Sequence, residues 1–146
     1  DFLKYFQSAI RRMRFRKGRV FVHFGPVVSP DVCVIIADFL LRVQSVNWSV
    51  VSGLHEEKLL TIFRNDGLRM NAGGVAKKGF GQIGPAGGHK SVARAELALS
   101  DLAELVPWQD EKKLGRWIVQ RVEGRSRRRK KPAPPPSQPP AAAKDA

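Results

Sequence analysis

The residue types best suited to chemistry in this sequence lie in one glycine-rich stretch and on the segments beside it. Gly87-Gly88-His89-Lys90 combines two glycines, an imidazole and a cation, and Arg94 follows shortly after. Glycine lets a ligand approach the backbone closely, and consecutive N–H groups in a turn can bind an anion. Arg64 could grip a phosphate with two hydrogen bonds, and His89 could stack on a base or hydrogen-bond a phosphate. Together these residues predict an anion site; singly, each is also compatible with an ordinary turn or a solvated strand end.

A hydrolytic centre is not predicted from the residues. His23, His55 and His89 are far apart in sequence, and none has a metal-ligand spacing with Cys33 or with a carboxylate cluster. The chain contains no nucleophile elbow, no phosphate-loop lysine motif and no paired acid and base carboxylates. We therefore predict a binding domain with no catalytic residue, metal or cofactor of its own.

The charge favours an anionic partner. The 146 residues include 26 basic and 13 acidic side chains, a formal net charge of +13. Seven basic residues and one acidic residue lie in 124–146, so the rest of the chain still has 19 against 12. Such a basic body is typical of nucleic-acid or nucleotide binding, and equally of docking on an acidic neighbour.

Cysteine content and hydropathy limit the cellular compartment and the kind of partner that we expect. The single cysteine, Cys33, cannot form an internal disulfide and suits a reducing, cytoplasmic compartment. No apolar run approaches the roughly 18–20 residues that span a bilayer, so we expect no membrane partner. The chain begins with Asp1 and no signal-like segment follows, and we expect it to be a piece of a longer protein.

The clearest element that could position these residues is a helix over 29–43. Ser29 can cap it, Pro30 suits its first position and Asp31 suits its positive end. We predict that its apolar stripe is core and that Cys33, beside it, is a small semi-buried side chain rather than a reactive thiol. The stripe consists of Val32, Ile35, Ile36, Phe39, Leu40 and Val43.

The remaining elements follow from periodicity and turn residues. We predict an amphipathic helix over 1–13 with a solvated basic end. We also predict a helix that is capped by Asp110 and has Leu114, Trp117, Ile118 and Val122 on one face. Residues 47–53 and 58–64 read as an antiparallel hairpin. The other predicted elements are strands over 19–24 and 91–99, and short helices over 71–80 and 102–106.

This order predicts an α/β fold with a mixed sheet of about four to five strands flanked by helices. From Gly124 onward the sequence is rich in Arg, Lys, Pro and Ala, so residues 124–146 are predicted to be a disordered basic tail. The expected organisation is a connector helix over 1–17, a domain over 18–123 and this tail.

The pattern resembles a known module. A strand with an arginine (Leu60–Arg64), a short helix (Asn71–Phe80) and a glycine-histidine turn (Gly87-Gly88-His89) occur in the same order in the C-terminal, DHH-associated domain of the DHH phosphoesterase superfamily. That superfamily includes RecJ-like exonucleases, oligoribonucleases and cyclic-dinucleotide phosphodiesterases. The resemblance covers roughly residues 18–100. This chain departs from the family pattern at Phe63, at Pro85-Ala86 and at Arg94, where smaller residues are usual.

The resemblance implies a function and partners. The metal-binding aspartates and the D-H-H signature of the family lie in an N-terminal domain, which would be the partner of this chain and, by resemblance, would hold divalent metal, namely manganese. This chain would be the substrate-binding half, with Arg64, Gly87, Gly88 and His89 contacting a short oligonucleotide or dinucleotide, and Lys90 and Arg94 beside them. The parent protein would be a hydrolase of phosphodiester bonds, and the fragment alone inactive.

Two alternatives from other classes stay open. Alanyl-tRNA synthetase and related editing proteins have a relative of this domain, so membership does not dictate hydrolysis. A non-catalytic nucleic-acid-binding module would act through its basic surface and tail, and its affinity would fall steeply with salt. A structural domain that forms a homodimer is the third reading.

Overall fold

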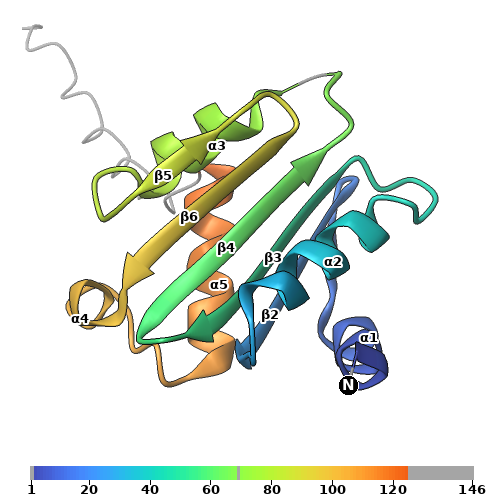
Figure 1. Cartoon of the computed structure of the whole chain (residues 1–146). Coiled ribbons are helices and arrows are strands. Elements are labelled where there is room, and N and C mark those ends of the chain that lie inside the picture. The colour runs from blue at the N-terminus through green and yellow to red at the C-terminus, as the bar shows by residue number, and fades with distance from the viewer. Residues whose placement is uncertain (1, 69, 125–146) are drawn as a thin grey trace, which may run out of the picture.

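The computed structural model describes residues 2–68 and 70–124 as a six-stranded mixed sheet with helices on both faces (Figure 1). In chain order the elements are α1 (Phe2–Arg12), β1 (Arg14–Arg16), β2 (Arg19–Pro26), α2 (Pro30–Leu40), β3 (Trp48–His55), β4 (Lys58–Asn65), α3 (Ala72–Phe80), β5 (Ala86–Gly88), β6 (Val92–Ala98), α4 (Leu99–Leu102) and α5 (Glu111–Glu123).

The strand order across the sheet is β1-β2-β3-β4-β6-β5. Strands β2 and β3 are parallel, and α2 provides the crossover between them. All other neighbouring pairs are antiparallel, including the predicted hairpin of β3 and β4. The α/β class with a mixed sheet is therefore confirmed, with six strands instead of four to five.

Two hydrophobic cores lie on opposite faces of the sheet. One face is covered by α1 and α2, which bury apolar side chains of β2, β3 and β4 such as Val22, Val51 and Ile62. The other face is covered by α3 and α5, which bury Phe63, Leu97 and Phe80. Since alternate residues of a strand point to opposite faces, each central strand contributes to both cores.

Side-chain caps fix the starts of three helices. The Ser29 hydroxyl accepts from the Asp31 N–H, and the Asp110 carboxylate accepts from the Lys113 N–H, so the two predicted caps are confirmed. Asn71 caps α3 by accepting from the Gly74 N–H. Each cap satisfies an amide that has no partner within the helix.

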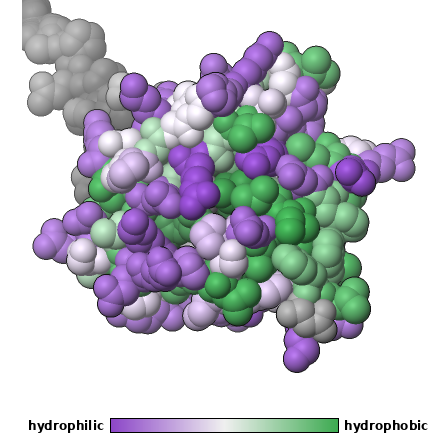
Figure 2. Space-filling model, in the orientation of Figure 1, coloured by the Kyte–Doolittle hydropathy of each residue, from purple (hydrophilic) through white to green (hydrophobic). Residues whose placement is uncertain are grey.

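The apolar stripe of α2 was predicted entirely as core, and this is wrong at two positions. Val32, Ile36 and Leu40 are buried, but Ile35 and Phe39 are 41% and 43% exposed. The helix is rotated so that the small residues Cys33 and Ala37 also face the sheet. The surface over α1 and α2 is consequently rich in hydrophobic side chains (Figure 2).

Two short strands were not predicted. Residues 14–16 were read as the end of a connector, yet they pair with β2 around the two-residue loop Lys17-Gly18, in which both φ angles are positive. Residues 86–88 were read as part of a turn, yet they pair with β6. Three-residue segments of arginine or glycine lack the β-branched residues that signal a strand. The short helix predicted over 102–106 is also displaced, because α4 occupies Leu99–Leu102.

The predicted disordered tail lies outside the described residues, apart from Gly124, which ends α5 in the left-handed conformation. Across the part of the chain that is described, no helix is long and apolar enough to cross a bilayer.

Candidate ligand-binding faces of the sheet

Strand alternation brings three of the predicted residues onto one face of the sheet. Arg94 on β6 lies between Ile62 of β4 and Gly87 of β5 in the register, and Arg64 lies opposite Val92. Arg64 and Arg94 are therefore diagonal neighbours on adjacent strands, a relation in which Cα atoms are about 7–8 Å apart. This is the face that α1 and α2 cover elsewhere.

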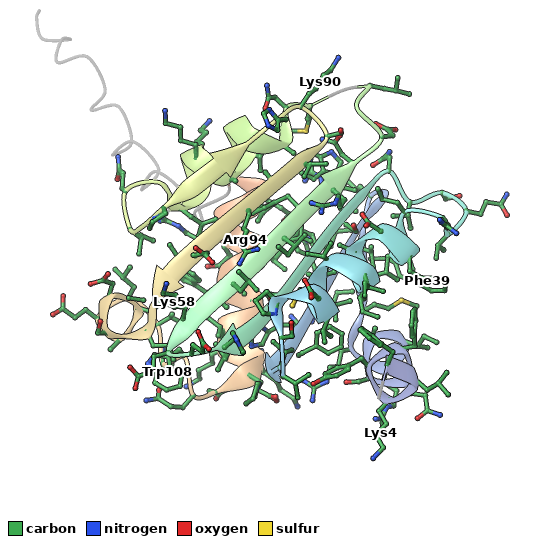
Figure 3. The ribbon with its side chains drawn as sticks, in the orientation of Figure 1. Lys4, Phe39, Lys58, Lys90, Arg94 and Trp108 are labelled. Atoms are coloured by element: carbon green, nitrogen blue, oxygen red, sulfur yellow. The ribbon has the colours of Figure 1, made fainter. Side chains whose placement is uncertain are left out.

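The part of this face over β6 and β5 is not covered by a helix. Helix α2 contacts β3 and β4, and the side chain of Arg94 is 45% exposed. Figure 3 shows Arg94 on this open area, with Lys58 nearer its lower end. A shallow hollow of about 180 Å³ lies beside Arg94 and is lined by Pro30, His55, Glu56, Lys58, Leu60, Arg94 and Glu96. We call the surface formed by Arg64, Gly87, Val92 and Arg94 the open face; Arg64, at its border with α2, has a side chain that is 14% exposed.

Both arginines of the open face are already ion-paired. The Arg64 Nε donates to Asp38 Oδ1 of α2 at 2.9 Å, and its Nη1 donates to the Phe63 carbonyl oxygen at 3.1 Å. The Arg94 Nη2 donates to Glu96 Oε1 at 2.7 Å. An anionic ligand would have to share these guanidinium groups with carboxylates.

Gly88, His89 and Lys90 lie at the end of the β5–β6 hairpin, where the hairpin meets the start of α3. The Ala72 and Gly73 N–H groups of α3 donate to the Lys90 and His89 carbonyl oxygens at 2.7 and 2.8 Å. The His89 N–H donates to the Val92 carbonyl oxygen. The backbone of this turn is thus engaged with α3 and β6, while the side chains of His89 and Lys90 are exposed; Figure 3 shows Lys90 at the tip of the molecule.

The two glycines of the turn have different surroundings. Gly88 has φ +153°, and a Cβ there would lie 2.4 Å from the Val92 carbonyl oxygen. A Cβ on Gly87 would meet no atom within 4 Å. Gly88 is therefore required by the fold, whereas Gly87 leaves bare backbone next to Arg94.

The side chain of Asn65, the last residue of β4, links the loop after β4 to the hairpin tip. Its Nδ2 donates to the Met70 and Lys90 carbonyl oxygens, and its Oδ1 accepts from the Gly67 N–H. The side chain is buried, with 5% exposed. Because one amide satisfies three backbone groups, the hairpin tip and the loop after β4 are fixed relative to each other.

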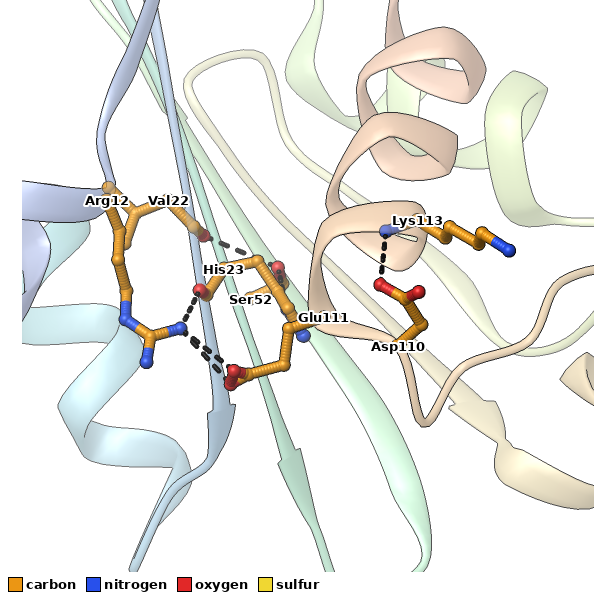
Figure 4. Close-up of polar contacts among 7 residues, drawn as sticks. All are labelled: Arg12, Val22, His23, Ser52, Asp110, Glu111 and Lys113. Atoms are coloured by element: carbon orange, nitrogen blue, oxygen red, sulfur yellow. Dashed lines mark hydrogen bonds and ion pairs between the residues drawn. The ribbon is translucent and has the colours of Figure 1, made fainter.

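A second polar cluster, which the sequence analysis did not identify, lies on the opposite face of the sheet (Figure 4). His23 of β2 makes a 2.9 Å hydrogen bond between its Nδ1 and Ser52 Oγ of β3. Burial lowers the pKa of His23 to about 4; the nearby Glu111 opposes this shift and Arg12 adds to it. The imidazole is thus neutral at pH 7.

Arg12 connects three elements around this histidine. Its Nη1 donates to the His23 carbonyl oxygen at 3.1 Å and lies 3.2 Å from Glu111 Oε1 at the start of α5. Farther along the same side, Arg16 and Arg19 pair with Glu123 near the end of α5. The basic end of α1 was predicted to be solvated, and Arg11 and Arg12 are both exposed; in addition, the Arg12 guanidinium links α1 to α5 through Glu111. The cluster of arginines could not predict these ion pairs, because Glu111 and Glu123 lie about a hundred residues away in the sequence.

Two further groups bear on chemistry. Cys33 lies on the buried side of α2, and burial raises the pKa of its thiol to about 12, partly offset by Arg94, so the thiol is not reactive in the folded chain. Among residues 2–68 and 70–124, no three His, Cys, Asp or Glu side chains lie close enough together to hold a metal ion.

Comparison of the sequence gives one relative. No protein-family model matches this chain. An uncharacterised protein of Methanocaldococcus jannaschii is 29% identical over 93 residues, which cover 63% of this chain and 19% of that protein. The chain thus spans about a fifth of the length of the curated relative it matches.

Comparison of the fold gives neighbours in larger proteins. An exopolyphosphatase-related protein from Bacteroides fragilis has a TM-score of 0.58 at 12% identity, over 84% of this chain and 34% of that one. The C-Ala domain of Aquifex aeolicus alanyl-tRNA synthetase has a TM-score of 0.53 at 14% identity, over 76% and 96%. A pGpG-specific phosphodiesterase from Vibrio cholerae has a TM-score of 0.51 at 10% identity, over 84% and 38%. At these identities the likeness shows a shared fold.

Proposed function

We propose that this chain is the DHH-associated, substrate-binding part of a phosphoesterase that acts on short oligonucleotides or dinucleotides. The fold likeness supports this proposal, because two of the neighbours are phosphoesterase-type proteins in which the matched region is about a third of the chain. The uncharacterised relative is also much longer than the matched stretch. In both cases a domain of this kind is one part of a longer polypeptide.

The observation that most directly supports the proposal is the pair of adjacent arginines on the open face. Arg64 and Arg94 can each donate to a phosphate oxygen, and two neighbouring guanidinium groups match consecutive phosphates of a short strand. Gly87, which presents no side chain beside Arg94, lets a nucleotide approach the sheet closely. Val92, which is 41% exposed, supplies apolar surface for a base or ribose.

The exposed side chains of His89 and Lys90 extend this basic surface at the tip of the hairpin. In the proposed arrangement they contact a terminal phosphate or base, while Arg64 and Arg94 hold the backbone. The role of these residues is to bind and orient the substrate.

The divalent metal of such an enzyme would belong to the N-terminal DHH domain. The described residues do not fit a metal site, since no cluster of three suitable ligands is found among them. We therefore assign no step of hydrolysis to this chain. A cytoplasmic location is in keeping with its free Cys33 thiol.

The proposal is tested by calorimetric titration of the 146-residue chain with a 5′-phosphorylated dinucleotide. We expect Arg94→Ala to weaken binding by about fivefold or more, as expected for loss of one charge-assisted hydrogen bond. Arg64→Ala and His89→Ala should also weaken it, with thermal melting to confirm that each variant is folded. Lys78→Ala, an exposed cation on α3, is the charge-matched control.

Equal losses in Arg94→Ala and Lys78→Ala would mean that net charge, and not the open face, binds the dinucleotide. Unchanged binding in Arg64→Ala, Arg94→Ala and His89→Ala would overturn the site assignment.

A second function is favoured by the excess of basic residues in 124–146. A non-catalytic nucleic-acid-binding module would bind mainly through this segment and the basic body, with an affinity that falls steeply with salt. Deleting residues 125–146 separates the two. Loss of all affinity supports the second function, and retention of dinucleotide binding supports the first.

A further inference from the structure

A cleft of about 570 Å³ lies between the end of α1, strand β2 and helix α5, on the opposite face of the sheet from the open face. This volume falls in the usual range of about 300–1,000 Å³ for small-ligand sites. The cleft takes no part in the function proposed above, and its lining differs from that of the open face.

Three cations without an acidic partner line the cleft. Arg11 and Arg14 flank the end of α1, and Lys112 projects from the first turn of α5. Within residues 2–68 and 70–124, no carboxylate lies within ion-pair distance of any of the three. The one carboxylate that lines the cleft, Glu111, is paired with Arg12. The lining therefore has a surplus of positive charge.

Apolar side chains form part of the floor of the cleft, beside His23 and Ser52. Phe21 and Val50 of the sheet and Ile118 of α5 line it and are almost completely buried. A flat, weakly polar group such as a nucleobase matches a floor of this mixed character better than a phosphate does, because a phosphate gains nothing from apolar contact.

One polar atom of the interior has no partner. His23 Nε2 is buried and makes no hydrogen bond with any residue of 2–68 or 70–124. The Ser52 hydroxyl donates to the Val22 carbonyl oxygen, so the hydrogen between His23 and Ser52 belongs to His23 Nδ1, and Nε2 keeps a free lone pair. An unpaired buried acceptor is costly and is satisfied when a ligand donates an N–H or O–H group to it.

The walls of the cleft are fixed to each other. Arg12 at the end of α1 joins Glu111 at the start of α5 and the backbone of β2, as Figure 4 shows. This bridge holds the two helices at a set distance and also neutralises Glu111, whose charge would otherwise repel an anion.

From these features we propose that the cleft is a second ligand site, which binds a nucleoside monophosphate. The phosphate lies among Arg11, Arg14 and Lys112, and the nucleoside lies against the floor of the cleft. A ribose hydroxyl or a base amino group donates to His23 Nε2. This site is independent of the open face and of the function assigned to it.

The test is titration of the 15N-labelled chain with adenosine 5′-monophosphate, followed by NMR. We expect saturable shifts of the Ser52 and Gly115 amides, which line the cleft, and none at Gly87 of the open face. The 15N resonance of His23 Nε2 should move as its lone pair accepts a hydrogen bond. A His23→Gln variant assigns that resonance.

The matched control comes from two adjacent lysines of α5. Lys112 lines the cleft and Lys113 does not, and both are exposed. Lys112→Ala should raise the dissociation constant of the monophosphate by about fivefold, as loss of one charge-assisted contact predicts. Lys113→Ala should change that constant by less than about twofold.

Four results would overturn the proposal. These are the absence of saturable binding at millimolar ligand, shifts confined to the open face, equal losses in Lys112→Ala and Lys113→Ala, and inorganic phosphate binding as tightly as the nucleotide with the same shifts. Because the open-face proposal is tested with a dinucleotide and Arg94→Ala, either proposal can fail without the other.

Discussion

Gly73 and Gly88 lie so close together that a Cβ on Gly73 would be 2.4 Å from the Gly88 carbonyl oxygen. This contact brings the first turn of α3 against the β5–β6 hairpin, where its amides donate to His89 and Lys90. The position of the predicted glycine-histidine turn therefore depends on a glycine fourteen residues before it in the sequence.

Gly73→Ala is expected to destabilise the fold by about 1–3 kcal/mol, the usual cost of forcing extra atoms into a packed site. The free energy of unfolding in urea measures it. Gly87→Ala is the control, because a Cβ there meets no atom within 4 Å, and its stability should stay within about 0.5 kcal/mol of the original chain. A cost at Gly87 equal to that at Gly73 would contradict the packing argument.

Asp38→Asn is expected to increase the affinity of the open face for a phosphorylated dinucleotide. The substitution removes the carboxylate that shares the Arg64 guanidinium and leaves a neutral group of the same size. Since a partly exposed ion pair contributes up to about 1 kcal/mol, the gain should be at most about fivefold, and smaller at high salt. Glu104→Gln, an exposed acid with the same charge change, is the comparison in calorimetry. If both variants gain equally, the effect is one of net charge.

The stability of the chain should fall as the pH is lowered from about 6.5 toward 4, in part because of His23. Burial lowers the pKa of its imidazole to about 4, so between these values the unfolded chain binds a proton that the folded chain does not. The stability that comes from the neutral His23 is present above pH 6.5 and is lost on acidification. The free energy of unfolding should fall by about 2 kcal/mol between pH 7 and pH 5 from this residue.

Urea unfolding of the original chain and of His23→Gln at both pH values isolates this effect from that of the carboxylates. The variant should lose less stability between pH 7 and pH 5. An identical pH dependence in the two proteins would show that His23 titrates normally.

Replacing Glu56-Glu57 by Asn-Gly is expected to stabilise the β3–β4 hairpin. Both glutamates have positive φ, 49° and 62°, in a two-residue loop of the type that favours Asn-Gly. A side chain in the left-handed region costs roughly 1–2 kcal/mol, so a gain of about 1 kcal/mol in the free energy of unfolding is expected. Lys17→Asn, in a loop that already has a glycine at its second position, should gain less. A loss of stability on replacing Glu56-Glu57 would mean that the 3.6 Å contact of His55 with Glu56 matters more than the backbone strain.

Local signals predicted the parts of the fold that short-range chemistry decides. Ser29 and Asp110 were identified as caps because each is a short polar residue directly before a segment with helical apolar periodicity, which is the usual signal of a helix N-terminus. The β3–β4 hairpin followed from two apolar runs separated by a few polar residues. The same reasoning fails for β5. Its residues, Ala-Gly-Gly, have no strand preference, and they form a strand because the edge of β6 beside them is available for pairing.

The candidate sites depend on contacts between distant segments, and these were only partly predictable. Arg64 and Arg94 share a face because side chains alternate along β4 and β6. This could be predicted only if the pairing of β4 with β6 and its register were already known. The pairing of Arg64 with Asp38, and of Arg12 with Glu111, joins residues 26 and 99 positions apart. The role of His23 could not be predicted from its own strand. Its hydrogen-bond partner, Ser52, lies on a different strand, 29 positions later in the sequence.

Both edge strands are only three residues long, and this affects how the molecule can associate. β1 presents Arg14 and Arg16, whose charges oppose pairing with a further strand, and β5 has the start of α3 against its outer side. Continuous sheets between copies, or between this unit and a neighbouring domain, are thereby disfavoured. Association is left to side-chain surfaces, which can be altered one residue at a time without disturbing the hydrogen-bonded ladder.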